Sequence, residues 1–467
     1  MSMDTSGPSA WVRLAAAIET FFVRHRDRLK YVHAAMFVFF MVVIFGPLVV
    51  EDAPAGATAF THLRPFANYI LWGLWFPLVL LSVIVTGRSW CGLLCPMGAA
   101  AEWGNKVGPQ RPVPAWMRWE GMPIVSFVVV TILGQTLGVR THAEAAAQIF
   151  GGTMLLAVIV GFFYGRRRRA WCRHLCPIGL LLGIFSRLGA VEFRPVVRLP
   201  GGDAYTDKGI CPMMIDLPRK EESRHCIECF RCVNPGAKGG MNVVLRRPGS
   251  EVERIRDHHA NPVEVWFLFL GTGIALGGFL WGILPLWQDL RAMAGEWAIG
   301  QGWYWFVSPG PGWLMSVHPD RREVYLWLDF VMISGFMVAV MLAVASALTA
   351  TTAVAAALSG RGGGDHSFQG RFAELGYQYA PVAMVSLVVG LGGQLFTPLQ
   401  ILAGPAVVGW AKGGLFLLGL VWSVWLGDRI LGHQGVRPGL PRLLSLTPGA
   451  LGSLMVAAGW WPAIFGL

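Results

Sequence analysis

All eight cysteines of this 467-residue chain lie in short motifs. Two copies of the sequence Trp-Cys-x-x-Leu-Cys-Pro-x-Gly occupy residues 90–98 and 171–179. The remaining cysteines form a Cys-Pro dipeptide at residue 211 and a Cys-x-x-Cys-x-x-Cys run over residues 226–232. Thiolates bind soft metals and take part in redox chemistry. The spacings therefore predict a metal or redox function.

The run over residues 226–232 is typical of a ferredoxin. Three thiolates at two-residue gaps can surround one face of an iron–sulfur cubane, and in bacterial ferredoxins a distant cysteine followed by proline supplies the fourth ligand. Structural zinc is the alternative, although its cysteines usually come as two separate pairs. A disulfide is disfavoured in a reducing cytoplasmic segment. We predict one [4Fe–4S] cluster bound by Cys211, Cys226, Cys229 and Cys232.

Basic side chains surround this run. They offset the negative charge of a ligated cluster, dock an acidic partner, or serve as solvated residues that set the membrane topology. The residues are Arg224, Arg231, Lys238, Arg246 and Arg247.

The repeated motif predicts a second thiolate site. If each Cys-x-x-x-Cys is helical, its two sulfurs lie on one face, while the proline that follows disfavours helix at the second cysteine. Two such pairs at one membrane face would converge and hold a second cluster, a single iron or zinc. Redox-active dithiols, or inert thiols at packed helix ends, remain alternatives. The residues are Cys91, Cys95, Cys172 and Cys176.

Composition indicates that membrane helices position these motifs. Hydrophobic residues make up 54% of the chain and charged residues 14%, whereas soluble domains carry about 25% charged residues. Mean hydropathy is +0.52. Apolar runs long enough to cross a bilayer predict about nine spans, at residues 31–50, 67–85, 122–137, 149–164, 265–286, 326–348, 379–396, 409–426 and 449–465. A soluble enzyme and a disordered chain are excluded.

The net charge of +11 has a topological explanation. Lysines and arginines cluster beside apolar runs, as in residues 24–30 and 166–169, and such clusters mark the cytoplasmic side of membrane proteins. Binding to nucleic acid is therefore not expected. Residues 11–22 resemble an amphipathic surface helix without a signal cleavage site, so we expect the N-terminus to remain attached and cytoplasmic.

We expect an all-α polytopic membrane protein with a small cytoplasmic iron–sulfur segment. The predicted domains are a cytoplasmic amphipathic N-terminus (1–30), a four-helix membrane unit with the duplicated motif (31–190), a ferredoxin-type segment (191–261) and a C-terminal membrane unit of about five helices (262–467). Asp329 and Glu374 lie at span ends, and His258 and His259 border the fifth span. For these four residues, structural roles are favoured over ion, quinone or heme sites.

The repeated Cys-x-x-x-Cys-Pro hairpins, followed by a ferredoxin-type segment, resemble the NapH/NosR/CcoG group of membrane-bound polyferredoxins. The resemblance covers residues 31–262, and it implies iron ligation by the repeat cysteines as well as the soluble ones. The chain departs from that group in having one cysteine triplet rather than two complete four-cysteine runs. It also has about five further spans and no obvious flavin-attachment domain. With those spans, it also resembles the ferredoxin-type subunit of Ftr-like ferrous iron uptake systems.

The resulting hypothesis is an electron-transfer subunit in the cell inner (plasma) membrane, rather than a stand-alone enzyme. It would relay electrons between a quinol or cytosolic donor and a periplasmic or membrane partner subunit, with lipid and a quinone as further partners. The alternatives are an electron-transfer subunit of a metal uptake system and an assembly or reductase factor for a metalloenzyme.

Overall fold

The structure is a computed structural model that describes residues 10–54, 56–201, 205–206, 209–236 and 239–465. Lys238 and the first nine residues of the predicted N-terminal domain lie outside the described residues. The predicted all-α class is confirmed, because helices dominate and the described residues contain only two small two-stranded sheets.

Within the described residues, eight helical stretches are long and apolar enough to cross a membrane, rather than the nine predicted. They are Ala10–Leu48, Leu63–Thr86, Ala143–Phe163, Pro262–Leu280, Trp327–Arg361, Phe368–Leu391, Pro405–His433 and Leu440–Gly459. The predicted span at 122–137 forms helix α6 (Met122–Thr136), which has 15 residues. At 1.5 Å per residue it covers about 22 Å, short of the roughly 30 Å of a bilayer core.

The chain divides into two compact units, each built from three segments. Unit 1 comprises Met1–Phe40, Leu81–Glu120 and Met154–His259, and unit 2 comprises Met41–Leu80, Gly121–Thr153 and Ala260–Leu467. Each unit therefore joins stretches that are distant in sequence. The four consecutive domains expected from the sequence remain a prediction.

Unit 1 contains every cysteine. Its complete helices are α1 (Ala10–His25), α5 (Pro96–Val107), α9 (Ala170–His174), α10 (Gly179–Ser186) and α11 (Ser250–Glu253). Helices α2 (Leu29–Phe45), α4 (Phe76–Thr86) and α8 (Gly152–Phe163) pass from one unit to the other. Strands β1 (Val191–Pro195) and β2 (Met241–Leu245) pair antiparallel, with Phe193 opposite Val243. Both side chains are buried and close one side of a core that also contains cysteines.

Unit 2 is a helical bundle with a short hairpin. Its helices are α3 (Leu63–Asn68), α6, α7 (Ala143–Ala146), α12 (Pro262–Leu280), α13 (Pro285–Gly300), α14 (Trp327–Arg361), α15 (Phe368–Gly376), α16 (Ala380–Leu391), α17 (Thr397–Ala403), α18 (Pro405–His433), α19 (Leu440–Gly459) and α20 (Trp461–Phe465). Strands β3 (Val317–His318) and β4 (Glu323–Val324) form the hairpin.

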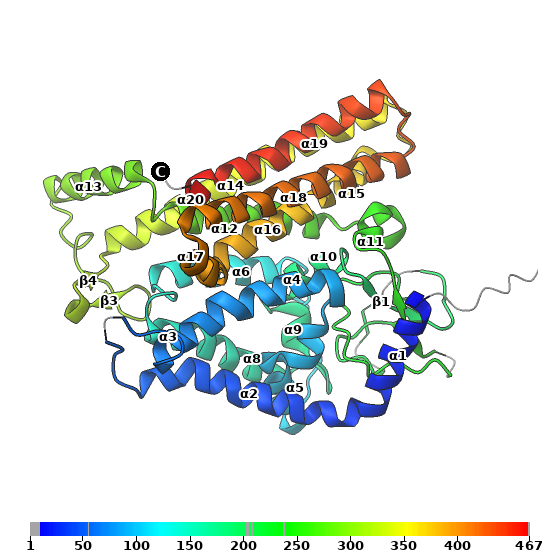
Figure 1. Cartoon of the computed structure of the whole chain (residues 1–467), viewed down its shortest axis with the longest axis horizontal. Coiled ribbons are helices and arrows are strands. Elements are labelled where there is room, and N and C mark those ends of the chain that lie inside the picture. Colours follow the sequence, from blue (N-terminus) through cyan, green and yellow to red (C-terminus); the bar gives the residue numbers. More distant parts are fainter. Residues whose placement is uncertain (1–9, 55, 202–204, 207–208, 237–238, 466–467) are drawn as a thin grey trace, which may run out of the picture. The chain divides into compact units, whose positions relative to one another are not determined.

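Long helices of unit 2 pack side by side, with α14 against α12 and α19, and α18 against α16 and α19 (Figure 1). A Cβ added at Gly273 of α12 would lie 2.8 Å from the Met341 Cα of α14. Small residues let membrane helices approach this closely, which explains the glycine at this point of the α12–α14 contact.

The polar residues noted near the span ends have structural partners. The Asp329 carboxylate accepts a hydrogen bond from the Leu326 amide at the start of α14 and pairs with Arg291. The Glu374 carboxylate accepts hydrogen bonds from His366 and Gln434. His258 and His259 both contact Glu221, through its carbonyl and its carboxylate respectively. These contacts agree with the structural roles favoured for the four residues.

Candidate iron–sulfur site

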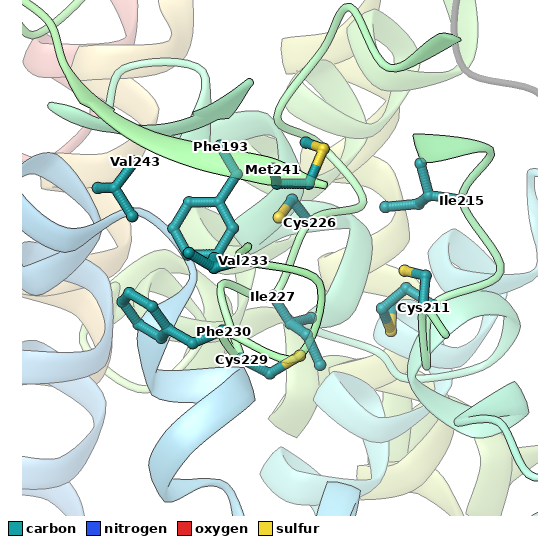
Figure 2. Close-up of a cluster of buried hydrophobic side chains, with 11 residues drawn as sticks. Phe193, Cys211, Ile215, Cys226, Ile227, Cys229, Phe230, Val233, Met241 and Val243 are labelled. Carbon is teal, nitrogen blue, oxygen red and sulfur yellow. The ribbon is translucent and has the colours of Figure 1, made fainter. Parts of the chain in front are cut away.

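The ferredoxin-type cysteines gather in one core of unit 1. We call Cys211, Cys226, Cys229 and Cys232 the ferredoxin quartet. The first three are buried, with 7–9% of their surface exposed, and Cys232 packs against the same core. Figure 2 shows the three buried thiols among apolar side chains that include Phe193, Phe230 and Met241. Cys211 is thus in one core with the triplet, although up to 21 residues of sequence separate them.

The thiols of the ferredoxin quartet lie close enough to affect one another. Burial raises the pKa of Cys232 well above its usual value, and the neighbouring Cys226, Cys229 and Cys211 raise it further. Burial also raises the pKa of Cys226, where the cation of Lys220 opposes the effect. Without metal, the thiols of Cys226 and Cys232 therefore hold their protons more tightly than free cysteine does, and metal binding would release those protons.

The loop backbone wraps around the sulfurs. Glu228 and Phe230, which flank Cys229, have φ of 50° and 59°. Positive φ is uncommon for residues other than glycine, and such turns can aim successive N–H groups into one concavity that suits an anionic or iron–sulfur group. The Glu228 N–H group donates a hydrogen bond to the Cys226 sulfur. Hydrogen bonds to sulfur are one means by which proteins set the potentials of iron–sulfur clusters.

The repeated motif forms a second group, the repeat quartet of Cys91, Cys95, Cys172 and Cys176. The two copies meet, since a Cβ added at Gly98 of the first copy would lie 3.3 Å from the Cys172 sulfur of the second copy. Burial raises the pKa of Cys176, and the other three cysteines raise it further. Cys172 lies in α9, and Cys95 has extended backbone (φ −68°, ψ 114°) and precedes α5. The second cysteine of each copy thus leaves the helix, as the following proline predicted.

All three Cys-Pro sequences share one hydrogen bond. The N–H group two residues after the cysteine donates to its sulfur, from Met97 to Cys95, Ile178 to Cys176 and Met213 to Cys211. Proline has no N–H group, so the next residue supplies the first free donor. The Cys-Pro sequence therefore builds local support for a thiolate.

The two quartets are neighbours. Cys91 and Cys172 of the repeat quartet pack against the core that contains the ferredoxin quartet. A Cβ added at Gly92 would lie only 2.0 Å from the Ile227 carbonyl oxygen and 2.9 Å from the Cys229 nitrogen. The first copy of the repeat therefore contacts the triplet loop backbone to backbone.

Buried arginines accompany both copies of the repeat. Arg88 and Arg169 each stand two residues before the Trp-Cys pair of the motif, and they are 2% and 0% exposed. Arg88 donates a hydrogen bond to the Arg224 carbonyl oxygen (2.5 Å). Arg169 donates from Nε to Glu102 (2.9 Å). In the sequence, Arg169 looks like part of a topology-setting run of arginines. An arginine at the same position before both motif copies is the sequence signal that Arg169 is instead a buried partner of the motif.

A cavity of about 430 Å³ adjoins the ferredoxin quartet. Cys229, Glu102 and His33 contribute to its wall, and basic residues (Arg26, Lys30, Lys106 and Arg231) line it as well. His33 Nε2 lies 3.0 Å from the Gly92 carbonyl oxygen. Because a carbonyl oxygen only accepts, Nε2 carries the proton of this bond. A ligand in this cavity would lie beside a cysteine of the ferredoxin quartet.

The donor set fits iron–sulfur groups. All eight cysteines are free thiols, they form two groups of four, and backbone N–H groups support their sulfurs. A buried guanidinium atom, Arg169 Nη2, has no hydrogen-bond partner within the described structure and lies among these groups. In the described part of the chain, no three His, Cys, Asp or Glu side chains converge to hold a single metal ion.

Comparison with known proteins points to the same chemistry. A family described as a 4Fe-4S binding domain matches residues 69–114 and 148–194, and each segment contains one copy of the repeat. The ferredoxin-type protein NapH of Haemophilus influenzae is 24% identical over 180 residues, which are 34% of this chain and 62% of NapH. The regulatory protein NosR of Stutzerimonas stutzeri is 22% identical over 245 residues, 44% of this chain and 33% of NosR.

An uncharacterised protein of Methanocaldococcus jannaschii is 24% identical over 173 residues, 35% of this chain and 68% of that protein. No solved structure matches the chain. Each of these three relatives thus aligns with less than half of the chain.

Proposed function

From the premise that this chain is a ferredoxin-type membrane protein of the NapH/NosR type, we propose that it relays electrons between a quinol or cytosolic donor and a partner redox protein. The resemblance to NapH and NosR expected from the cysteine motifs is confirmed, and a membrane iron–sulfur electron-transfer role follows from it. A resemblance to Ftr-like uptake subunits remains a prediction. The donor, the acceptor and the individual ligands are part of the proposal.

The observation that carries the proposal is the contact between the two quartets of cysteines. In our proposal, the ferredoxin quartet binds one [4Fe–4S] cluster and the repeat quartet binds a second iron–sulfur group. When bound, these groups accept and release single electrons. The chain's own contribution is to hold the sulfurs, to supply N–H donors to them, and to keep the two sites adjacent.

The cavity beside Cys229 is the proposed point of electron entry. It adjoins the start of α2, where the first apolar span begins, and it combines Trp103 and Leu29 with the His33 imidazole. With Nε2 bonded to Gly92, the Nδ1 of neutral His33 is an acceptor. An amphipathic quinol would find both apolar surface and an acceptor for its hydroxyl proton there.

The proposed location is the inner (plasma) membrane with the cysteine sites on the cytoplasmic side. The basic residues beside the spans support this orientation. A cysteine-accessibility or protease-protection assay on inverted vesicles would test it, because cytoplasmic residues become accessible only in that preparation.

Anaerobic purification with iron and acid-labile sulfide analysis tests the central proposal. We expect iron and sulfide, a broad visible absorption that bleaches on reduction, and EPR signals. We further expect Cys229→Ser and Cys172→Ser to remove different signals. Met241→Leu is the matched control, because Met241 is buried in the ferredoxin core but is no proposed ligand.

Anaerobic wild-type protein without iron or sulfide would end this proposal. Equal loss of iron in Met241→Leu and Cys229→Ser would show that core packing, rather than ligation, explains the loss. The donor is then tested in liposomes, where added quinol should bleach the visible absorption of the wild-type protein.

A further inference from the structure

Three charged residues lie between the two quartets. Arg169 Nε donates a hydrogen bond to Glu102 Oε2 (2.9 Å), and Arg231 reaches both Glu102 oxygens (2.7 and 2.8 Å). We call Glu102, Arg169 and Arg231 the Glu102 clamp. The Arg169 side chain is fully buried, that of Glu102 is 11% exposed and that of Arg231 is 34% exposed. One carboxylate thus holds two guanidinium groups, which leaves the clamp with one net positive charge.

The clamp is bonded to the backbone of both quartets. Arg169 Nη1 donates to the Cys91 carbonyl oxygen of the repeat quartet (2.9 Å). The Arg169 backbone N–H group donates to the Pro212 carbonyl oxygen, next to Cys211 of the ferredoxin quartet (2.8 Å). Arg231 lies in the triplet itself, between Cys229 and Cys232. Arg169 is therefore fixed with respect to both sites.

The Arg169 guanidinium lies close to a sulfur of the repeat quartet. A Cβ added at Gly98 of the first motif copy would lie 2.9 Å from Arg169 Nη1 and 3.3 Å from the Cys172 sulfur. Through Glu102, the same guanidinium shares a carboxylate with Arg231 of the triplet. The charge of Arg169 is therefore placed to act on both quartets.

The competing explanation is that the Glu102 clamp only joins structural elements. The two explanations differ in whether the clamp needs a positive charge in excess. A salt bridge that only joins elements needs no excess charge, and burying an unbalanced charge is costly. The clamp has one positive charge in excess, shared with the one-third exposed Arg231, and the fully buried Arg169 leaves its Nη2 without a hydrogen-bond partner in the described structure. A positive charge at this point offsets negative charge that the quartets carry when they hold iron.

We propose that the Glu102 clamp couples the two quartets electrostatically, with Arg169 favouring electrons on both sites and thereby setting their reduction potentials together. The inference rests on the proposed function, in that both quartets must hold redox-active iron. Each reduction adds one electron and no bond changes. Arg169 and Arg231 favour the added negative charge, and Glu102 opposes it. Arg169 and Glu102 are positioning residues, because neither touches a reacting atom.

Redox titration of the purified full-length protein, followed by EPR with dithionite as reductant, tests the inference. We expect Arg169→Gln to lower the midpoint potentials of both signals and Glu102→Gln to raise them. Arg231→Gln should lower the potential of the ferredoxin quartet more than that of the repeat quartet. Arg169→Lys keeps the charge and should stay closer to the wild-type potentials than Arg169→Gln.

Arg194→Gln is the matched control, because it removes one positive charge from β1 of the same unit, where the side chain is 53% exposed. Its solvated charge should leave both potentials close to wild type. Hydrogen–deuterium exchange of each variant provides a structural readout independent of electron transfer.

The opposite signs expected for Arg169→Gln and Glu102→Gln separate electrostatic coupling from a structural role, which would move both variants in the same direction. Unchanged potentials in both variants, or a shift as large in Arg194→Gln, would overturn the inference while the proposed function stands. If Arg169→Gln fails to fold, the shifts in Glu102→Gln and Arg231→Gln decide the matter. Wild-type protein with iron in only one quartet would refute the coupling.

Discussion

Replacing Gly92 by alanine is a sharp test of the contact between the two quartets. The added methyl group would lie 2.0 Å from the Ile227 carbonyl oxygen, more than 1 Å closer than ordinary contact at 3.4 Å. This oxygen and the other near neighbour, the Cys229 nitrogen at 2.9 Å, are backbone atoms, so no side-chain rotation can relieve the clash. The first copy of the repeat and the triplet loop must therefore move apart.

Overpacking of this kind costs about 1–3 kcal/mol. Against it stands the gain of roughly 1 kcal/mol that alanine normally brings over glycine in a helix. Because the displaced atoms belong to Ile227 and Cys229, we expect net destabilisation together with loss of iron from the ferredoxin quartet. The repeat quartet should keep more of its iron than the ferredoxin quartet.

The assay compares iron per protein, the EPR signal of each quartet and unfolding in detergent mixtures. Gly335→Ala in α14 is the control, since a Cβ there meets nothing within 4 Å. It should retain wild-type iron and be neutral or slightly stabilised. Wild-type iron content and stability in Gly92→Ala would refute the contact, and with it the adjacency of the two quartets.

Three further predictions address charge and metal. Burial would raise the pKa of Glu102, but Arg169 and Arg231 outweigh burial and lower the pKa to about 2. The ionised Glu102 therefore stabilises the folded state fully above the unfolded pKa of 4.5, and this contribution is lost as the pH falls toward 2. Unfolding temperatures between pH 7 and pH 3 should therefore fall more steeply for wild type than for Glu102→Gln, and parallel curves would contradict this. Glu251 pairs with Arg187 and Arg246 and is 1% exposed. Glu251→Ala should therefore lower the free energy of unfolding in detergent by about 3–5 kcal/mol. Asp216→Ala removes a more exposed pair with Arg219 and should lower it by no more than about 1 kcal/mol. Removal of iron by a chelator should make residues 209–236 sensitive to protease while helical circular dichroism persists, because metal binding contributes folding free energy to a loop that supplies the ligands. Equal protease resistance with and without iron would argue against this.

Local sequence predicted most of the long helices and the grouping of the cysteines. Apolar runs of about 20 residues predicted most of the long helices, because span length and hydropathy are properties of contiguous residues. Cysteine spacing predicted which cysteines would lie near one another, since a two-residue gap or a following proline restricts where neighbouring sulfurs can point. Their binding of iron stays a prediction. The length of α6 was the exception. Its helix ends at Thr136 and has only 15 residues.

Tertiary structure alone decided the relation between the quartets. Gly92 and Arg173 occupy the same position in the two motif copies, yet only Gly92 faces the Ile227 carbonyl at a distance that excludes a side chain. Glu102 belongs to no motif, and Arg169 is one of four consecutive arginines, so neither is marked in the sequence as a partner of the other. The roles that we propose for them depend on hydrogen bonds between residues 67 and 129 positions apart. Sequence patterns report on neighbours along the chain, whereas a buried charge acquires its partners only when distant segments fold together.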